Sequence, residues 1–378
     1  MHLKFKQRID NLIGGSLVAL HLIPVRFLGK ILRLNHNLNQ APQNIIILKM
    51  LGFGSLILAS DAILAIKKKY PNCKFTLICS SSLDEGAASL KLYDNILNIY
   101  DKSIFTLIKS SLNVIFQCLK LKDKWCFDFE VYSRLTTIFS LYTFSKNRFG
   151  FEFEKVNFRN YLNTHNTYFN LFIPTEENYN KMAENIGAII SERYFLPQKN
   201  DNKEYKYIVI NNTCSDLSIQ RKLESWQIID IINYIQTETK YTVALAGSPA
   251  DKLTNEQIIA QIDNSESIEN WAGKHSFNKY LELLANQTKA MITIDSAPLH
   301  IAARLEIPLL AIWGPTQPQS LAPKWLRESA LYKEINLSVN CSPCVHHTKE
   351  LPCGGNNFCI KNITSVQLKS YLSDFING

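Results

Sequence analysis

Short apolar runs alternate with longer amphipathic stretches over most of the chain. The runs lie at residues 44–49, 74–79, 207–210, 290–294 and 309–313. Each has the length of a strand that is buried on both faces of a parallel sheet. The stretch 56–71, between the first two runs, has apolar residues at helical spacing and ends at Pro71. This order predicts an α/β protein built from Rossmann-like units.

The segment from Ala290 to Pro315 predicts a strand, a helix and a second strand. Asp295 and Ser296 end the first strand, and Pro298 falls in the first turn of the helix, where its missing N–H costs nothing. Ser296 is also a suitable N-cap residue. The free amides and the dipole at such a helix start favour a phosphate or diphosphate. An ordinary strand-to-helix turn is the alternative interpretation.

Two motifs in this segment resemble the donor-site signature of glycosyltransferase family 9, the heptosyltransferases of lipopolysaccharide synthesis. They are ThrIleAspSerAlaProLeuHis (293–300) and IleTrpGlyProThr (312–316). The resemblance covers about residues 44–370 and implies a GT-B architecture, with two Rossmann-like domains facing each other across a cleft. Ala297 stands where the family usually has glycine, which brings a methyl group close to the expected diphosphate. The resemblance implies that the donor is bound by Asp295, Ser296, Ala297, His300 and Gly314. It places Gly273 in the loop that borders the nucleotide base of the donor.

Length and composition describe a folded protein of two domains. The chain has 378 residues, 46% of them hydrophobic, and this length exceeds what one hydrophobic core usually organises. We expect an amino-terminal arm at 1–41, an acceptor-side Rossmann-like domain at 42–185 and a nucleotide-sugar-binding Rossmann-like domain at 186–378. The net charge of +8 suits an acidic partner. No stretch resembles a nucleic-acid-binding motif, so we expect a sugar nucleotide or an anionic membrane and no nucleic acid.

The arm at 1–41 is both basic and apolar. We expect its apolar stretch 12–24 to be too short and too interrupted to span a bilayer, which needs about 20 apolar residues. No signal-peptide cleavage site follows it. The arm predicts either an interfacial helix on an anionic membrane or a helix packed on the protein. The first interpretation places the protein in the cytoplasm, peripheral on the inner membrane face.

A glycine-rich turn at 51–55 follows the first predicted strand. In the family this loop usually ends in Gly-Asp, and the aspartate is regarded as the base that activates the acceptor hydroxyl. Here Gly54 is followed by Ser55. A serine hydroxyl does not accept a proton at neutral pH. The chain therefore needs another base on its acceptor side, or it has lost the reaction.

The segment 125–134 supplies candidate bases. Asp128 and Glu130 are predicted to share one face at the end of a short strand. The resemblance places both carboxylates, and Arg134 after them, in the acceptor-side domain. A partly buried carboxylate deprotonates a sugar hydroxyl when its surroundings tune its pKa; a surface ion pair of Glu130 with Arg134 is the alternative. His165, in a stretch similar to the family's L-T-H sequence, is also expected to face the acceptor.

Arg221 and Lys222 match the basic residues that meet the donor diphosphate in the family. A fixed cation at that position acts on the transition state, because negative charge accumulates on the leaving nucleoside diphosphate. The usual Trp-Pro after the basic pair is replaced by Leu223 and Glu224. A solvated pair at a helix start is the alternative. We therefore count Arg221 and Lys222 with Glu130 and Asp128 as the predicted catalytic residues.

Nine cysteines mostly lack the spacing of a disulfide framework, which fits a reducing compartment. Two near pairs in the carboxyl-terminal tail are compatible with tetrahedral zinc. Free thiols or disulfides are the alternative to this structural site. The four candidate ligands are Cys341, Cys344, Cys353 and Cys359.

The resemblance implies an inverting glycosyltransferase that needs no cofactor and transfers heptose from ADP-heptose to a lipid-linked lipopolysaccharide core or a similar glycan. A glycosyltransferase with a different nucleotide sugar is one alternative. Ser55 and Ala297 motivate another, a binding or scaffold protein that kept the fold and lost catalysis. A dinucleotide oxidoreductase fits less well, because the first turn lacks a full G-x-G-x-x-G.

Overall fold

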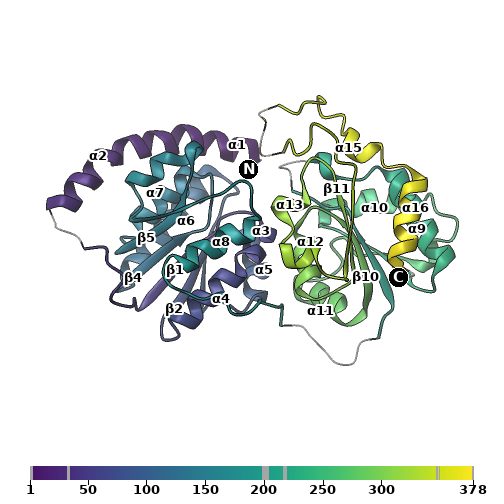
Figure 1. The fold of residues 1–378 in the computed structure, drawn as a ribbon, viewed down its shortest axis with the longest axis horizontal. Coiled ribbons are helices and arrows are strands. Elements are labelled where there is room, and N and C mark those ends of the chain that lie inside the picture. Colours follow the sequence, from purple (N-terminus) through teal and green to yellow (C-terminus); the bar gives the residue numbers. More distant parts are fainter. Residues whose placement is uncertain are drawn as a thin grey trace. The chain divides into compact units, whose positions relative to one another are not determined.

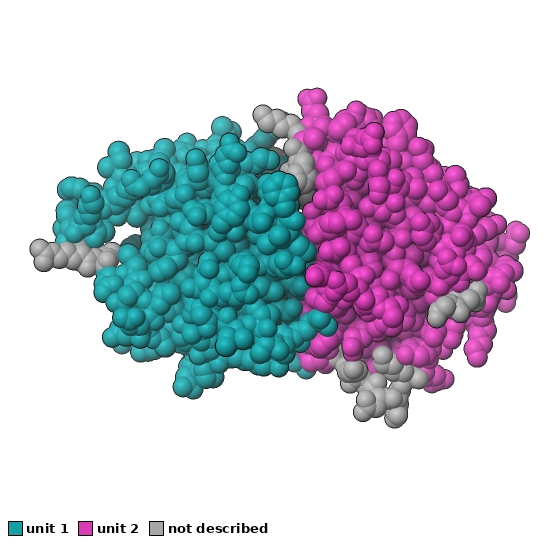
Figure 2. Space-filling model, in the orientation of Figure 1, with its two compact units in different colours: residues 1–194 teal, residues 195–378 magenta. Residues whose placement is uncertain are grey.

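The computed structural model describes residues 3–31, 35–197, 204–215, 219–345, 348 and 350–376. Each half of the chain contains a parallel sheet of six strands flanked by helices (Figure 1). Two compact units result, Met1–Tyr194 and Phe195–Gly378 (Figure 2). The predicted α/β class is thereby confirmed.

The strands of the first unit lie in the order β3-β2-β1-β4-β5-β6, and all neighbours are parallel. Every residue of β1 and β4 is buried, as expected for central strands covered on both faces. The chain moves outward from β1 to β3 and then returns to β4. The carboxyl ends of β1 and β4 therefore form the switch point where parallel sheets usually bind ligands. The strands are β1 (Asn44–Leu48), β2 (Lys74–Ser80), β3 (Asn95–Ile99), β4 (Lys124–Asp128), β5 (Asn147–Glu152) and β6 (His165–Tyr168).

Helices cover both faces of this sheet. They are α3 (Phe53–Leu58), α4 (Ser60–Lys69), α5 (Asp84–Ser89), α6 (Ile104–Lys120), α7 (Arg134–Tyr142) and α8 (Thr175–Glu184). Because crossover connections are right-handed, the return helices α6 and α7 lie on the face opposite α4 and α5. Val114 of α6 and Phe139 of α7 accordingly pack in one core cluster with Ile46 and Cys126 of the sheet. On the other face, α8 packs against α4.

The amino-terminal arm is helical and packs on the first unit. It consists of α1 (Leu3–Ile9), a π-helical turn (Asp10–Gly14) and α2 (Gly15–Ile31). Val18 of α2 joins Ile138 and Leu162 in a small core. The helical stretch Phe5–Ile31 is long and apolar enough to cross a membrane by length and composition. The apolar stretch 12–24 was predicted to be too short to span a bilayer. This was wrong, because the helix continues through Pro24 and includes the basic residues on both sides of the stretch.

The structure extends the first unit beyond the predicted boundary at 185/186. Residues 186–194 belong to the first unit, where Ile186 and Tyr194 are buried. The backbone N–H of Tyr194 donates a hydrogen bond to Oδ1 of Asp61 (2.8 Å), which fixes this segment beside α4. The polar stretch 199–203 that indicated a linker lies outside the described residues.

The second unit repeats the same design, with strand order β12-β11-β10-β7-β8-β9. Its switch point lies between β7 and β10, because the chain leaves β9 and crosses back to β10. Its strands are β7 (Tyr207–Asn211), β8 (Thr242–Ala246), β9 (Ile268–Asn270), β10 (Thr288–Ile294), β11 (Leu309–Trp313) and β12 (Tyr332–Asn336).

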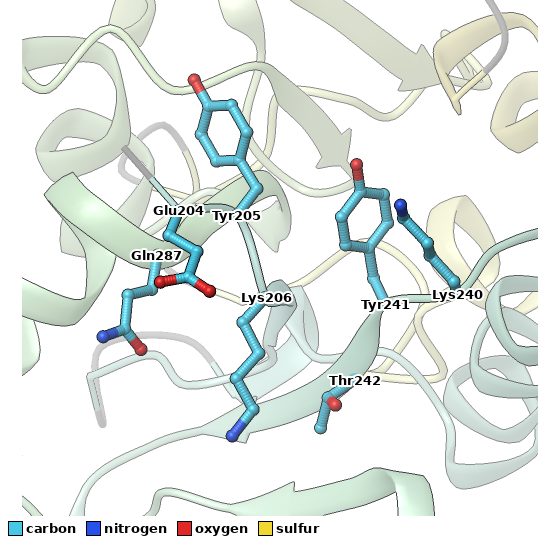
Figure 3. Close-up of a pocket in the computed structure, with 7 residues that line it drawn as sticks. All are labelled: Glu204, Tyr205, Lys206, Lys240, Tyr241, Thr242 and Gln287. Carbon is cyan, nitrogen blue, oxygen red and sulfur yellow. The ribbon is translucent and has the colours of Figure 1, made fainter. Parts of the chain in front are cut away.

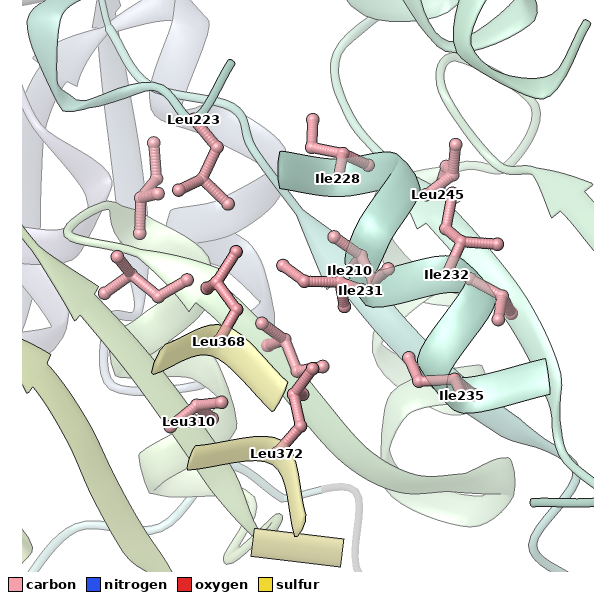
Figure 4. Close-up of a cluster of buried hydrophobic side chains, with 14 of the residues drawn as sticks. Ile210, Leu223, Ile228, Ile231, Ile232, Ile235, Leu245, Leu310, Leu368 and Leu372 are labelled. Carbon is pink, nitrogen blue, oxygen red and sulfur yellow. The ribbon is translucent and has the colours of Figure 1, made fainter. Parts of the chain in front are cut away.

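One large apolar core holds the second unit together. Figure 4 shows Ile231 of α9 and Leu372 of α16 packed over Ile210 and Leu310 of the sheet. Burial of such side chains provides most of the free energy that favours folding. The helices of this unit are α9 (Ser225–Glu238), α10 (Lys252–Ile259), α11 (Phe277–Gln287), α12 (Ala297–Arg304), α13 (Pro318–Leu321), α14 (Lys324–Arg327), α15 (Phe358–Lys361) and α16 (Ser365–Ile376).

Candidate active site

Glu130 lies just beyond β4, at the switch point of the first unit. β4 ends at Asp128, so the expectation that both carboxylates lie on one strand was wrong. Instead, the N–H of Glu130 donates to Oδ1 of Asp128 (3.0 Å), in a turn that follows the strand. Oε1 of Glu130 accepts hydrogen bonds from Nζ of Lys49 (2.9 Å) and from the N–H groups of Met50 (2.8 Å) and Leu51 (2.9 Å). The turn after β4 is thus bound to the loop after β1.

This arrangement fixes one oxygen of the Glu130 carboxylate. In the described part of the chain, the donors to this side chain all reach Oε1, and the side chain retains 15% of its exposure. Burial alone lowers the pKa of Lys49, but Glu130, Tyr179 and Asp128 together outweigh burial, so the pKa of Lys49 is raised. Lys49 is therefore a cation here. An oriented carboxylate with one oxygen left for substrate has the geometry of a general base.

Asp128 is fully buried beside this turn. Its Oδ2 accepts a hydrogen bond from Thr136 (3.0 Å) and lies 3.5 Å from Nη2 of Arg159. Burial raises the pKa of Asp128 to about 6, while Arg159 opposes the rise. A side chain with no exposed surface does not reach an acceptor sugar. The geometry therefore makes Asp128 a positioning residue for the Glu130 turn rather than the predicted catalytic carboxylate.

Ser55 lies in the short helix α3, near Lys49. The sharp turn before the helix is made by Gly52, with φ of +81°, so Gly54 is already helical. The hydroxyl of Ser55 shares a hydrogen bond with buried Tyr179, whose pKa is raised by burial. Tyr179 also interacts electrostatically with Lys49 and Glu130. Ser55 therefore belongs to the network around the carboxylate without supplying a base itself.

Arg134, predicted to face the acceptor, instead contacts the amino-terminal arm. Its Nη1 donates to Oδ1 of Asn11 (2.7 Å), and its guanidinium carbon lies 5.4 Å from the centre of the Phe158 ring. Asp10 caps α7 by accepting hydrogen bonds from the N–H groups of Arg134 (3.0 Å) and Leu135 (2.9 Å). The arm is thus tied to the helix that follows the Glu130 turn. Glu130 pairs with Lys49 instead of forming the surface ion pair with Arg134.

His165 lies at the start of the edge strand β6, two strands away from β4. Its ring stacks on Phe149, with 4.7 Å between the centroids, and its Nδ1 is 2.9 Å from the hydroxyl of Thr164. Burial lowers its pKa, so the imidazole is neutral at physiological pH. These contacts give His165, which was expected to face the acceptor, a packing role in the sheet two strands away from β4.

In the second unit, the predicted anion site is the start of α12. Ser296 is its N-cap, with Ala297 as the first helical residue and Pro298 in the first turn. The hydroxyl of Ser296 does not cap the helix, contrary to expectation; it is buried and has no hydrogen-bond partner among the described residues. The same holds for the hydroxyl of Thr316, just after β11. Two buried hydroxyls without partners, beside adjacent strand ends, are typical of a site that a polar ligand completes.

Arg221 reaches this edge from the loop after β7. Its Nη1 donates to the backbone oxygen of Asp295 (2.7 Å) and lies 3.5 Å from the Asp295 carboxylate. Its Nη2 donates to the hydroxyl of Ser215 (3.2 Å). The guanidinium is therefore fixed beside the residue that precedes the start of α12. Residues 216–218 of the same loop lie outside the described residues.

Lys222 forms a separate ion pair. Its Nζ lies 2.8 Å from Oδ1 of Asp251, whose Oδ2 accepts hydrogen bonds from the hydroxyls of Thr213 and Ser248. Burial alone raises the pKa of Asp251, but Lys222 and these donors outweigh it and the pKa is lowered. The structure therefore brings Arg221 to Asp295 and holds Lys222 at Asp251. Of the two basic residues predicted to meet the diphosphate, Arg221 is the one that lies beside the start of α12.

Three other predicted donor residues have structural explanations. His300 is buried, and burial lowers its pKa to about 4. A Cβ on Gly314 would lie 2.6 Å from the side chain of Ile360, so glycine is required for α15 to pack there. Gly273 has φ of +67°, and its Cβ would lie 3.0 Å from Pro249. Sequence analysis attributed all three residues to ligand binding.

The four tail cysteines line one small cavity. Burial raises the pKa of the Cys344 thiol, and raises that of Cys359 to about 12, whereas backbone N–H groups lower the pKa of Cys353. Cys341 is half-buried, and all four thiols are free. Among the residues that the structure describes, no three His, Cys, Asp or Glu side chains are arranged to hold a metal ion. The thiols converge as expected, but the donor geometry of the zinc hypothesis is not met.

A separate pocket of about 290 Å³ lies near the amino-terminal ends of β7 and β8. Figure 3 shows Lys206 and Thr242 among its lining side chains. Asp295 and Ser296 follow the carboxyl end of β10 in this parallel sheet, so the pocket lies at the opposite edge from the anion site. It is therefore not part of the candidate active site.

Lys49, Arg159 and Tyr179 were missed as site residues. Lys49 had a signal in the sequence, because it is the last residue of the run 44–49, which predicts a buried strand. A lysine there needs a carboxylate partner. Arg159 and Tyr179 had no such local signal, since each reaches the site from a separate element.

A family model described as glycosyltransferase family 9 (heptosyltransferase) matches residues 152–354, which is more than half of the chain. The chain belongs to glycosyltransferase family 9. This confirms the resemblance drawn from the motifs at 293–300 and 312–316.

Curated relatives of this family 9 chain include two lipooligosaccharide heptosyltransferases 2. The protein from Haemophilus influenzae is 42% identical over 85 residues, which are 22% of this chain and 24% of that protein. The chain thus spans about a quarter of the length of the first curated relatives that it matches. A protein from Campylobacter jejuni is 22% identical over 314 residues, which are 82% of this chain and 92% of the relative.

Solved structures resemble the whole fold. The E. coli ADP-heptose lps heptosyltransferase II has a TM-score of 0.69 at 16% identity, covering 88% of this chain and 98% of that one. The E. coli heptosyltransferase WaaC with ADP has a TM-score of 0.67 at 11% identity, covering 88% and 99%. These likenesses confirm the predicted GT-B fold class with its two Rossmann-like domains.

Proposed function

We propose that this family 9 chain is an inverting glycosyltransferase that transfers heptose from ADP-heptose to a lipid-linked lipopolysaccharide core or a similar glycan. The observation that carries the proposal is the Glu130 carboxylate, bound through one oxygen by Lys49 and two backbone amides at a switch point. Its support comes from relatives named as heptosyltransferases and from a similar structure that contains ADP-2-deoxy-2-fluoro heptose.

The first unit contributes the base in this proposal. Oε2 of Glu130 takes the proton of the acceptor hydroxyl, and the acceptor oxygen attacks the anomeric carbon of the donor. As the new bond forms, the bond from that carbon to the diphosphate oxygen breaks, and ADP leaves with the electron pair. Attack from the face opposite the leaving group inverts the anomeric configuration. Glu130 replaces the aspartate that the family usually carries at the position of Ser55.

The second unit contributes stabilisation of the leaving group. The diphosphate accumulates negative charge as the glycosidic bond breaks, and the amides at the start of α12 favour an anion. The fixed guanidinium of Arg221 adds a positive charge beside Asp295. Buried donors of this kind act mainly on the transition state, because they are oriented before the charge develops. The reaction proposed here needs no cofactor.

A lipid-linked acceptor places the enzyme at a membrane surface. We accordingly propose a cytoplasmic protein with peripheral contact to the inner membrane face. The arm, with its basic residues and exposed apolar side chains, supports this location.

The deciding experiment follows nucleotide release from a panel that includes ADP-heptose and other nucleotide sugars, with and without a heptose-free lipopolysaccharide acceptor. We expect ADP release to depend on both ADP-heptose and acceptor, and the linkage formed to have the inverted configuration. Turnover with another donor alone would replace the donor assignment. Nucleotide binding without any transfer would favour the scaffold alternative, which Ser55 and Ala297 motivate.

A further inference from the structure

Helix α6 exposes a continuous row of large apolar side chains. One side of α6 is buried against the sheet through Val114 and Cys118. The opposite side repeats an apolar residue every three or four positions, as one face of a helix does. Between 47% and 73% of each of these side chains is exposed. The row consists of Ile104, Phe105, Ile108, Leu112, Phe116 and Leu119.

The arm has the same two-sided character. Val18 is buried against α7, and Leu17, Leu22 and Val25 pack around it. The outward side of the helix carries a second apolar row at spacings of three and four residues. Its members are Leu20, Ile23, Phe27 and Ile31, each more than half exposed.

Both rows belong to the same side of the first unit. α6 and α7 cover one face of the sheet, and the arm packs on α7. The ion pair of Lys6 with Asp101 joins the start of the arm to the loop directly before α6. The start of the arm is thus joined to the start of α6.

The charges around these rows are mainly positive. Arg8 and Lys30 of the arm, and Lys109 and Lys120 of α6, are exposed. The nearby carboxylates of Asp10 and Asp101 are already engaged, by the start of α7 and by Lys6. Exposed apolar rows flanked by cations are complementary to an anionic bilayer, whose head groups attract the cations while its acyl boundary accepts the apolar side chains.

We propose that the arm and α6 together form a membrane-docking surface that binds an anionic lipid bilayer in its plane. The arm lies along the bilayer and does not cross it, because Asp10, Gly14 and Val18 fix it to the body of the first unit. The same surface orients the acceptor side, because Asp10 caps the helix that follows the Glu130 turn. The docking surface rests on the proposed peripheral location and specifies which residues make the membrane contact. Lipid binding by this surface does not depend on the transfer reaction.

The test measures sedimentation of the full chain with vesicles of phosphatidylglycerol and phosphatidylcholine, and with vesicles of phosphatidylcholine alone. The informative variant is Phe105→Ser/Phe116→Ser in α6, which leaves the arm intact. Two aromatic side chains withdrawn from the bilayer boundary should weaken binding to the anionic vesicles by at least about tenfold. Lys109→Gln/Lys120→Gln should weaken it by about fivefold for each charge, with a loss of salt sensitivity. Leu253→Ser/Val366→Ser, exposed positions of the second unit, serves as the matched control.

Binding of the α6 variant equal to that of wild type would overturn the proposal, since the arm alone would then carry the affinity. Equal binding to neutral vesicles would also overturn it, because the cations would then have no role. A wild-type protein that is dimeric in solution, becomes monomeric in the α6 variant and ignores vesicles would show that a second copy covers the surface. Unchanged ADP binding and circular dichroism in each variant establish that any loss is not unfolding. Failure of sugar transfer would leave this result intact, because the readout is lipid binding.

Discussion

Nζ of Lys49 lies 2.9 Å from Oε1 of Glu130, and this contact joins the two central strands of the first sheet at their carboxyl ends. Lys49 follows β1 and is 3% exposed, whereas Glu130 follows β4. A buried ammonium is costly without a partner, so the pair is needed by the fold as well as by the site. The Met50 and Leu51 amides hold the same oxygen. The position of the carboxylate is consequently set by the backbone of the β1 loop.

Glu130→Gln should abolish most sugar transfer while nucleotide binding stays intact. The amide keeps an oxygen for the three donors, but it no longer accepts the proton of the acceptor hydroxyl. Loss of a general base typically costs about 10²–10⁴-fold in rate. The measurement is kcat with ADP-heptose and acceptor, together with the Kd for ADP by calorimetry.

Glu154→Gln, at an exposed position of the same unit, is the matched control and should leave kcat unchanged. Ser55→Ala should lower kcat less than Glu130→Gln does. A Glu130→Gln enzyme that transfers sugar at the wild-type rate over a full pH profile would move the base to another residue.

Lys49→Met should lower kcat while the Kd for ADP stays unchanged. The substitution removes one of the three donors that orient Oε1 of Glu130. Lys67→Met, at a more exposed ion pair, is the control. An unaltered kcat in Lys49→Met would show that the Met50 and Leu51 amides alone hold the carboxylate in place.

The sequence predicted the elements better than it predicted the contacts between them. Apolar runs located β1, β2, β7, β10 and β11, because an interior parallel strand is buried on both faces whatever its neighbours are. The turn Asp295–Ser296 and the helix start at Ala297 were also predictable, since capping and proline rules act locally. The position of Arg221 near this helix start was predicted only through the family resemblance, because Arg221 arrives from the loop after another strand.

Several predicted site residues have structural constraints that the sequence does not show. Gly314, Gly273 and His300 fit a ligand motif in the sequence, but their constraints come from Ile360, Pro249 and burial. Lys222 was predicted to meet the diphosphate, whereas in the structure it forms an ion pair with Asp251. Asp128 remained a competitor of Glu130 as the base, because the sequence does not show where β4 ends. Such distinctions depend on tertiary packing, which spacing along the chain does not encode.

Stability of the second unit should decrease on mild acidification because of His300. Its pKa is lowered to about 4 by burial, whereas an unfolded histidine has a pKa of about 6.5. The unfolded state therefore takes up a proton first, so the contribution of neutral His300 is complete above pH 6.5 and is lost as the pH falls toward 4. At pH 4.5 the loss is roughly 2 kcal/mol.

His300→Gln removes this titration, so the difference in unfolding free energy between pH 7 and pH 4.5 should be smaller in the variant than in wild type. Urea titrations at the two pH values measure it. An identical pH dependence in both proteins would show that His300 is protonated without cost in the folded state.

Arg221 and Lys222 should contribute unequally to donor binding, although they are adjacent in sequence. Arg221→Ala removes a guanidinium fixed beside the start of α12, and a charge-assisted hydrogen bond contributes about 1.5–3 kcal/mol, or about 10- to 150-fold in the Kd for ADP. Lys222→Ala should weaken ADP binding less than about threefold, because this cation is half-exposed and paired with Asp251. Arg221→Lys should lie between wild type and Arg221→Ala, since it retains the charge but not the planar fork. The Kd for ADP and kcat are measured for both single variants and for the double variant, with Lys361→Ala as an exposed control in the same unit.

Equal effects of Arg221→Ala and Lys222→Ala would mean that Lys222 leaves Asp251 and binds the diphosphate when the donor binds. An unaltered Kd and kcat in the double variant would show that the loop after β7 is not part of the donor site.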